Sequence, residues 1–193
     1  MKCYGLIRNW GEVVMGRVFR FKVALKRQRR LWRRIDVKGS QTLGDLDRVI
    51  REAFKHFLCD HLSEFFRGRV WHSEGLGEIH PGGVGDGAEK RIDSLALSEG
   101  DKLEYVYDFG DDIQHIITLE KIVEVEETVK YPRVVSQNKP KYSYCEECEK
   151  RGKRTLATGI CITCSTEAQR DVLVCEDCLV KGHEDHYTQE MLY

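Results

Sequence analysis

KLEYVYDFGDDIQHIITLEKIVEV, residues 102–125, is the stretch that decides the fold of the first part of this chain. Apolar residues dominate on both sides of the segment DFGDD, residues 108–112, whose aspartates and glycine are typical of a tight turn. The pattern predicts one strand over residues 102–107 and a second over residues 113–125. These two strands should form an antiparallel hairpin.

Another hairpin is predicted closer to the N-terminus. The stretch GRVFRFKVAL, residues 16–25, alternates with a period of two, which is typical of a half-buried strand. One set of alternating residues is Phe19, Phe21, Val23 and Leu25, and the other is Val18, Arg20, Lys22 and Ala24. A basic turn follows at residues 26–30, and LWRRIDVK, residues 31–38, forms the returning strand.

A helix is predicted over residues 43–57, because Thr42 and Asp45 have the T-x-x-D spacing of a helix cap. The apolar residues after the cap recur at three- and four-residue steps and share one face, which should lie on the sheet. They are Leu43, Leu46, Val49, Ile50, Ala53, Phe54 and Phe57. Residues 61–72 are expected to form a strand, residues 75–87 a glycine-rich loop and residues 93–97 one helical turn.

Hairpins packed by one helix indicate an α+β domain with a hairpin-rich antiparallel or mixed sheet. We assign residues 1–131 to this domain. Residues 132–143, with Pro132 and Pro140, have the composition of a linker. Residues 144–193 are expected to form a small C-terminal zinc-binding module.

Charge is distributed unevenly along the 193 residues, although the net charge is only −1. Residues 1–70 hold 17 Lys and Arg against 7 Asp and Glu, whereas residues 71–130 hold 5 against 15. The two regions can neutralise each other within one fold, or the basic region can face an anionic partner. No stretch resembles a signal peptide or a membrane-spanning helix, so we expect a soluble, cytoplasmic protein without a membrane partner.

Six of the eight cysteines form three C-x2-C pairs near the C-terminus, followed by two histidines. Zinc prefers thiolate and imidazole ligands, and eight ligands are the number needed for two closed tetrahedral sites. A structural zinc ion contributes on the order of 10 kcal/mol of folding free energy to a module too small for a large core. The predicted ligands of two structural Zn²⁺ ions are Cys145, Cys148, Cys161, Cys164, Cys175, Cys178, His183 and His186. The other two cysteines, Cys3 and Cys59, are expected to be buried as small apolar residues.

The spacing of the eight ligands resembles that of the cross-braced ZZ and B-box zinc fingers. In those classes the first ligand pair shares an ion with the third, and the second with the fourth. The resemblance implies one ion bound by Cys145, Cys148, Cys175 and Cys178, and another bound by Cys161, Cys164, His183 and His186. A sequential arrangement is the alternative. The resemblance also implies a role in recognising other proteins.

Three stretches together resemble the plasmid ORF-3-like family. They are WRRI at residues 32–35, TLGDLDRVI at 42–50 with HLSEF at 61–65, and YVYDFGDDIQHIITLEKI at 105–122. The resemblance spans residues 18–133 and implies the fold of that family. Some members are labelled as transposon-associated resolvases and others occur beside DNA-binding domains. The resemblance therefore implies a prokaryotic mobile-element protein rather than a defined reaction.

Two predicted strands carry a polar residue on their apolar side, Arg33 on one and His115 on the other. Because a buried charge is costly unless it is paired, we expect Arg33 to reach a carboxylate of Asp108, Asp111 or Asp112. This contact is either a structural tie between hairpins or part of a pocket formed by all five residues.

Two functions remain open. The first is a non-catalytic binding or regulatory protein, in which Arg27, Arg29 and Arg30 meet phosphates and Trp32 stacks on a base, although the same turn can simply be solvated. The second is a metal-dependent enzyme that acts on nucleic acid through the Asp/His cluster. The sequence contains no P-loop, Rossmann glycine pattern, nucleophile elbow or HExxH motif, which favours the first. The sequence does not specify whether the partner is a protein or a nucleic acid, and it does not specify the oligomeric state.

Overall fold

The computed structural model describes residues 16–191, which form two compact units. The first unit contains residues 16–27 and 33–136, and the second contains residues 28–32 and 137–191. No helix within the described residues is long and apolar enough to cross a membrane. Cys3 lies outside the described residues, and Cys59, predicted to be buried, is exposed.

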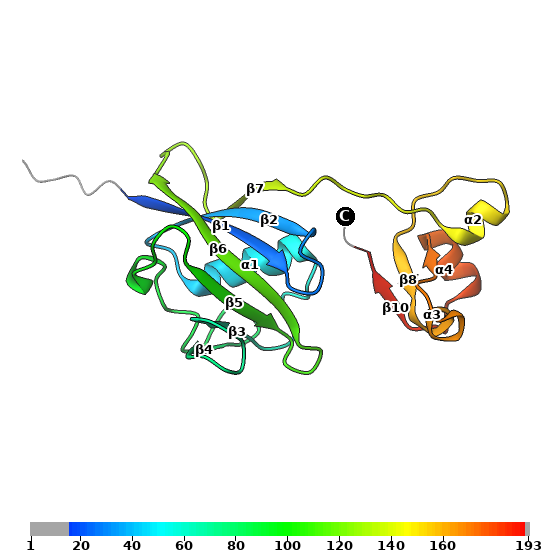
Figure 1. Cartoon of the computed structure of the whole chain (residues 1–193), viewed down its shortest axis with the longest axis horizontal. Coiled ribbons are helices and arrows are strands. Elements are labelled where there is room, and N and C mark those ends of the chain that lie inside the picture. Colours follow the sequence, from blue (N-terminus) through cyan, green and yellow to red (C-terminus); the bar gives the residue numbers. More distant parts are fainter. Residues whose placement is uncertain (1–15, 192–193) are drawn as a thin grey trace, which may run out of the picture. The chain divides into compact units, whose positions relative to one another are not determined.

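A seven-stranded sheet dominates the first unit (Figure 1). Its strands are β1 (Arg17–Leu25), β2 (Trp32–Lys38), β3 (Ser63–Phe66), β4 (Gly75–Ile79), β5 (Lys102–Tyr107), β6 (Ile113–Glu124) and β7 (Arg133–Gln137). Their order across the sheet is β4-β3-β5-β6-β1-β2-β7, so the two predicted hairpins are neighbours within it. β1 pairs antiparallel along its whole length with residues 115–124 of β6, with a register shift between Arg20 and Phe21. The α+β fold class predicted from the sequence is confirmed.

Helix α1 (Leu43–Phe54) covers one face of the sheet (Figure 1). It begins with the predicted cap, since the Thr42 side chain accepts a hydrogen bond from the Asp45 amide and the Asp45 carboxylate accepts one from the Thr42 amide. It ends at Lys55, which adopts the left-handed conformation with a φ of 56°. The predicted extension to residue 57 is therefore wrong, and Phe57 is 73% exposed rather than part of the apolar face.

The core lies between α1 and the sheet. Alternate residues of each central strand face the helix, as the period of two predicts. Its main members are Phe19, Phe21 and Val23 of β1, Ile35 and Val37 of β2, Leu103 and Tyr105 of β5, Ile117 and Leu119 of β6, and Leu46, Ile50 and Phe54 of α1. The opposite face of the sheet carries mostly charged and polar side chains, among them Arg20, Arg34 and Glu120.

Three segments at or next to the edges of the sheet differ from the sequence prediction. The strand expected over residues 61–72 is confined to β3, and residues 67–74 form turns in which the Arg67 amide donates to the Glu74 carbonyl. The loop predicted over residues 75–87 contains β4, and residues 133–137 of the expected linker form β7. β4 and β7 are the edge strands of the sheet, and edge strands bury few side chains, so their apolar pattern is weak. The helical turn expected near residue 93 is the short 3₁₀ helix η1 (Asp93–Leu95).

The second unit is built from short elements (Figure 1). Its helices are α2 (Glu146–Lys150), α3 (Ile162–Ala168) and α4 (Glu176–Gly182), and its strands β8 (Gly159–Cys161), β9 (Leu173–Val174) and β10 (Thr188–Glu190) pair in the order β10-β8-β9. Apart from cysteines, the buried apolar residues between residues 144 and 191 are Ala157 and Val174. Such a small apolar interior cannot offset the entropy of ordering this segment.

Candidate metal centre

Each C-x2-C pair lies across the start of a short helix. Cys145, Cys161 and Cys175 are the N-cap residues of α2, α3 and α4, and the second cysteine of each pair lies in the first helical turn. One turn of helix brings the two sulfurs of a pair close together, and the first amides of a helix favour a thiolate over a thiol. The local fold therefore prepares each pair as two adjacent metal ligands.

The eight predicted ligands converge in two groups of four. The four-cysteine group consists of Cys145, Cys148, Cys175 and Cys178, and the mixed group consists of Cys161, Cys164, His183 and His186. Within each group the ligand atoms all lie within 4.8 Å of one another. This is the cross-braced order, in which pairs distant in sequence share a group. The sequential alternative is not the arrangement found.

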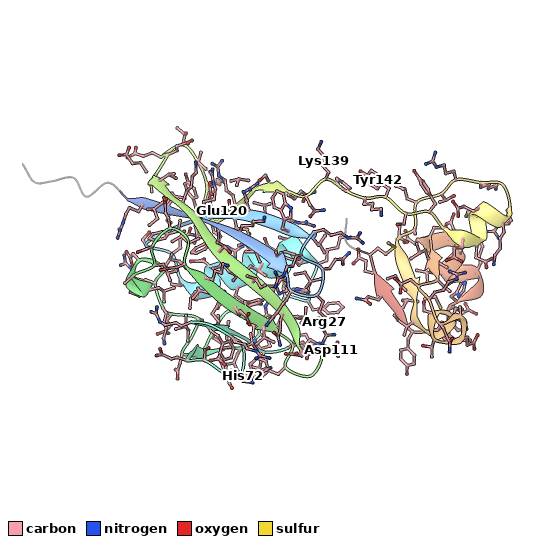
Figure 2. All side chains as sticks on the ribbon, viewed as in Figure 1. Arg27, His72, Asp111, Glu120, Lys139 and Tyr142 are labelled. Carbon is pink, nitrogen blue, oxygen red and sulfur yellow. The ribbon has the colours of Figure 1, made fainter. Side chains whose placement is uncertain are left out.

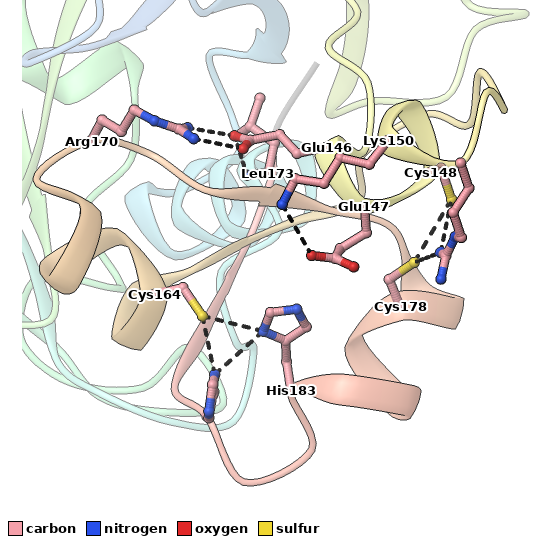
Figure 3. Close-up of polar contacts among 11 residues, drawn as sticks. Glu146, Glu147, Cys148, Lys150, Cys164, Arg170, Leu173, Cys178 and His183 are labelled. Atoms are coloured by element: carbon pink, nitrogen blue, oxygen red, sulfur yellow. Dashed lines mark hydrogen bonds and ion pairs between the residues drawn. The ribbon is translucent and has the colours of Figure 1, made fainter.

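The separations between ligand atoms fit tetrahedral coordination. Cys148 Sγ lies 3.8 Å from Cys175 Sγ and 3.7 Å from Cys178 Sγ (Figure 3). An ion with metal–sulfur bonds of about 2.3 Å needs sulfurs about 3.8 Å apart, whereas a disulfide needs about 2.05 Å. In the mixed group the Nδ1 atoms of His183 and His186 are 3.3 Å apart, which is about the separation that metal–nitrogen bonds of roughly 2.05 Å require. Both groups could therefore hold a metal ion.

A guanidinium lies against the four-cysteine group. Arg151 donates from Nη2 to Cys178 Sγ at 2.9 Å. Hydrogen bonds from Thr155 and Arg151 lower the pKa of the Cys148 thiol to about 6, whereas burial raises the pKa of the Cys178 thiol to about 12, with the Arg151 hydrogen bond acting in the opposite direction. Because only the deprotonated sulfur binds metal, the Arg151 contacts favour the form of the group that could hold an ion, and the arginine offsets part of its negative charge.

The mixed group is positioned by elements that the small sheet holds together. Cys161 ends β8, His183 ends α4, and the His186 amide donates to the His183 carbonyl. Arg170, which lies between α3 and β9 in the chain, donates to both carboxylate oxygens of Glu146 on α2, at 2.6 and 2.8 Å (Figure 3). Glu146 also accepts from the Leu173 amide, so it ties α2 to β9. These contacts leave little freedom for the segments that carry the ligands.

The aspartates of the predicted Asp/His pocket face several different groups. Asp108 Oδ2 lies 3.2 Å from His61 Nδ1. Asp112 accepts from Gln114 Nε2 at 2.7 Å and from Trp71 Nε1 at 3.0 Å, and these hydrogen bonds lower its pKa. Asp111 is exposed, with its amide donating to Asp108 Oδ1.

Arg33 is buried, as expected, but its contacts lie on α1. Its Nε donates to the Ala53 carbonyl at 3.3 Å, and its guanidinium lies 5.3 Å from the centroid of the Phe54 ring. Burial lowers the pKa of Arg33. These contacts of Arg33 are with α1, whereas the turn aspartates join β5 to β6, and β1 separates β2 from β6; two strand spacings amount to about 10 Å.

His115 also packs against the Phe54 ring. Its ring centroid is 4.7 Å from that of Phe54, and its Nε2 lies 3.3 Å from His56 Nε2. Burial, with a smaller effect of His56, lowers the pKa of His115 well below its usual value. Burial and the charge of Arg51 lower the pKa of His56 to about 4. Both imidazoles are therefore neutral at pH 7.

The sequence reasoning missed a buried polar cluster between α1 and the sheet. Asp47 Oδ1 accepts from Ser63 Oγ at 2.6 Å and from Tyr105 OH at 2.7 Å, while Asp47 Oδ2 lies 2.9 Å from Arg51 Nε. Arg51 also donates to the Asp60 carbonyl at 2.8 Å. The available signal was the four-residue spacing of Asp47 and Arg51 beside the apolar face of the helix.

The basic hairpin is partly neutralised and partly exposed. Arg27, Arg29 and Arg30 are exposed in the turn after β1, while Trp32 is half-buried (Figure 2 labels Arg27). On the strands themselves, Lys26 pairs with Glu104 at 2.7 Å and Arg34 pairs with Glu120 at 2.6 Å. The acidic half of the domain thus neutralises the strands of the hairpin, and the turn presents its arginines to solvent.

Comparison with known protein families gives a match over residues 17–149 to the plasmid pRiA4b ORF-3-like proteins. The chain belongs to this family. The match begins with β1, covers the whole seven-stranded sheet and ends just after Cys148. We refer to the first unit as the ORF-3-like domain and to residues 144–191 as the metal module.

Among solved structures, the ORF-3-like chain is similar to a crystal structure titled as a protein of unknown function, MM3350 from Methanosarcina mazei Go1. The two share 26% identity with a TM-score of 0.51, over 64% of this chain and 70% of that chain. No curated protein matches the chain. The comparisons therefore establish the family and support the fold, and the function has to be argued from the site.

Proposed function

We propose that this ORF-3-like protein is a non-catalytic binding or regulatory protein of mobile-element type, with a C-terminal module held together by two structural zinc ions. One observation carries the proposal: each group supplies four thiolate or imidazole ligands from the chain itself. Four protein ligands saturate a tetrahedral ion and leave no position for water or substrate, which is the mark of a structural rather than a catalytic zinc site.

The chemistry of the ligands supports zinc over other ions. Sulfur and imidazole nitrogen at tetrahedral spacing suit Zn²⁺, whereas Mg²⁺ and Ca²⁺ take oxygen ligands at higher coordination numbers. The module would then depend on metal for its fold, because Ala157 and Val174 supply little apolar burial.

The enzyme alternative receives no support from the Asp/His residues. His115 is enclosed beside His56, and the turn aspartates contact His61, Gln114 and Trp71 instead of converging on it. Within residues 16–191, groups of three or more potential metal ligands occur only in the metal module. A catalytic metal would need ligands that converge in the ORF-3-like domain as well.

Nucleic acid is the partner that the exposed basic turn fits best. Arg27, Arg29 and Arg30 project into solvent while the neighbouring cations Lys26 and Arg34 are paired with carboxylates. Exposed guanidinium groups gain affinity for a phosphate backbone by releasing its counterions. A protein partner is the other possibility, and the binding test below distinguishes it from nucleic acid.

Elemental analysis of the reduced full-length protein tests the zinc part of the proposal. We expect two zinc equivalents per chain, one for each group of ligands. Cys148→Ser and Cys164→Ser should each lose one equivalent, and Cys59→Ser, which changes an exposed cysteine outside both groups, should keep two. Less than one equivalent in the reduced wild-type protein would end the proposal, as would disulfides among these cysteines.

Salt-dependent retention on immobilised duplex DNA tests the partner. Replacing Arg27, Arg29 and Arg30 together by Gln should weaken binding and reduce the slope of log K against log salt by about 2 to 3. A matched control replaces three exposed cations elsewhere in the domain, Arg48, Lys90 and Lys130, by Gln. Equal losses in both variants, or no retention of the wild type at low salt, would contradict a role of the turn and favour a protein partner.

A further inference from the structure

An open cleft of about 700 Å³ lies on the charged face of the ORF-3-like sheet, away from α1. Four neighbouring strands, β6, β1, β2 and β7, contribute to it. Its lining residues are Arg20, Arg34, Glu120, Lys121, Arg133, Val134, Val135 and Ser136. Figure 2 labels Glu120 on β6. The cleft belongs to neither the metal module nor the basic turn.

Two of the arginines in the cleft are fixed by bidentate ion pairs. Arg20 donates to both oxygens of Asp36, from Nε at 2.7 Å and from Nη2 at 2.9 Å. Arg34 donates to both oxygens of Glu120, from Nε at 2.6 Å and from Nη2 at 3.2 Å. Bidentate pairing orients the plane of each guanidinium. The walls of the cleft are therefore ordered rather than built from mobile surface side chains.

The remaining two cations are not balanced in the same way. Arg133 Nη2 lies 3.6 Å from Asp36 Oδ2, an oxygen that already accepts from Arg20, and Arg133 Nε is buried without a hydrogen-bond partner among residues 16–191. Lys121 is exposed and forms no ion pair within that range. Two carboxylates, Asp36 and Glu120, thus face four cations, and a buried donor is left without an acceptor. A buried donor of this kind costs free energy unless a ligand or water satisfies it.

We propose that this cleft binds a small molecule that carries a phosphate group, with Arg133 and Lys121 as the main charge partners of the phosphate. Guanidinium forks match the geometry of phosphate oxygens, and a lysine adds a point charge beside them. The volume lies within the range of small-molecule sites. Val134, which is 41% exposed, offers an apolar wall to the uncharged part of the ligand.

The cleft is physically separate from the turn proposed to contact nucleic acid. Arg20 lies five residues before the end of β1, which is about 17 Å along an extended strand, and Arg34, the lining residue nearest to the turn in sequence, follows Arg30 by four residues, or about 13 Å. Binding in the cleft and binding at the turn can therefore be tested with different variants.

Isothermal titration calorimetry on the full-length protein at low salt provides the test, with adenosine monophosphate, inorganic phosphate and succinate as probes. We expect both phosphate compounds to bind and succinate to bind at least about tenfold more weakly, because a carboxylate presents fewer oxygens to the arginines. Arg133→Gln should weaken the binding of adenosine monophosphate about tenfold, and Lys121→Gln should weaken it to a smaller extent. Lys102→Gln, an exposed lysine outside the cleft, should leave it unchanged.

Two further variants keep the test decisive if Arg133→Gln folds poorly. Val134→Glu leaves every arginine in place but adds a negative charge to the wall, so it should abolish binding. The triple glutamine variant of Arg27, Arg29 and Arg30 should bind adenosine monophosphate like the wild type. No binding of any phosphate probe at millimolar concentration, equal affinity for succinate, wild-type affinity in Val134→Glu, or loss in the triple variant would each overturn the proposal.

Discussion

Asp47 connects α1 to the sheet through three side chains at once. Its carboxylate accepts from Ser63 and Tyr105 and faces Arg51, and both members of the ion pair are almost fully buried. Burying two charges is costly, and their attraction offsets that cost only when the remaining polar atoms are also satisfied. Removing one partner should therefore cost more than an average substitution.

We predict that Asp47→Ala lowers the free energy of unfolding of the ORF-3-like domain by about 3 to 5 kcal/mol, because it leaves the Arg51 charge buried without its carboxylate. Urea denaturation followed by tryptophan fluorescence measures this loss. The control is Arg48→Ala on the same helix, which removes an exposed ion pair with Glu52 at 3.1 Å and should change stability by no more than about 0.5 kcal/mol. Similar losses of unfolding free energy in the two variants would show that the buried ion pair contributes no more to stability than the exposed one.

His56 and His115 make the same domain sensitive to acid. The pKa of His56 falls to about 4 in the folded protein, below that of an exposed histidine, and the pKa of His115 also falls. A depressed folded pKa means that the unfolded chain binds more protons below pH 6.5. Stability is therefore complete above that pH and is lost as the pH falls towards 4.

His56 alone should cost the wild type about 2 kcal/mol of stability between pH 7 and pH 5. His56→Gln should remove this part of the pH dependence, since the amide does not titrate. His80→Gln, at a histidine whose side chain is 52% exposed, should leave the pH dependence as it is. Urea midpoints at the two pH values measure the difference, and an unchanged pH profile in His56→Gln would refute the assignment.

At the scale of the elements, α1 starts where its cap dictates. The reciprocal hydrogen bonds of Thr42 and Asp45 satisfy amides that the first helical turn leaves without partners. Thr42→Ala should lower the stability of the ORF-3-like domain by about 1 kcal/mol, whereas Thr42→Ser should keep most of it because the hydroxyl is retained. Equal stability of the alanine and serine variants in urea denaturation would mean that the cap contributes nothing.

The start of α1 depends on neighbouring residues, whereas the pairing of the strands depends on elements far away in sequence. β1 pairs with β6, about a hundred residues further along, and β7 completes the sheet beside β2. Alternation along each strand shows which residues face the helix, but it does not show which strand lies next to it. The ion pair between Arg34 of β2 and Glu120 of β6 is an example, because alternation alone does not show that these two strands lie on either side of β1.

At the scale of the whole molecule, the two units should respond differently to loss of metal. The core of the ORF-3-like domain is apolar and contains none of the eight ligands, whereas the metal module buries mainly its cysteines. A strong zinc chelator should therefore unfold the metal module and leave the ORF-3-like domain folded. Amide NMR spectra before and after chelation measure this outcome, and re-addition of zinc should reverse it. Collapse of the dispersed resonances of residues 33–136 together with those of the module would contradict it.

The sequence by itself determined the features that depend on near neighbours. Period-two alternation predicted β1, β2, β5 and β6, the T-x-x-D spacing predicted the start of α1, and three C-x2-C pairs with two histidines pointed to the eight residues that lie in two groups able to hold a metal ion. Each of these signals is local, because side-chain direction in a strand, amide satisfaction in a helical turn and ligand spacing in a tight turn involve residues a few positions apart.

Only the tertiary structure decided the features that depend on distant segments. It set the strand order, brought His56 against His115, joined Asp47 to Tyr105, and arranged four cations around two carboxylates in the cleft. The physical reason is that contacts between distant segments are selected by the packing of the whole core, to which any single stretch of sequence contributes only a part.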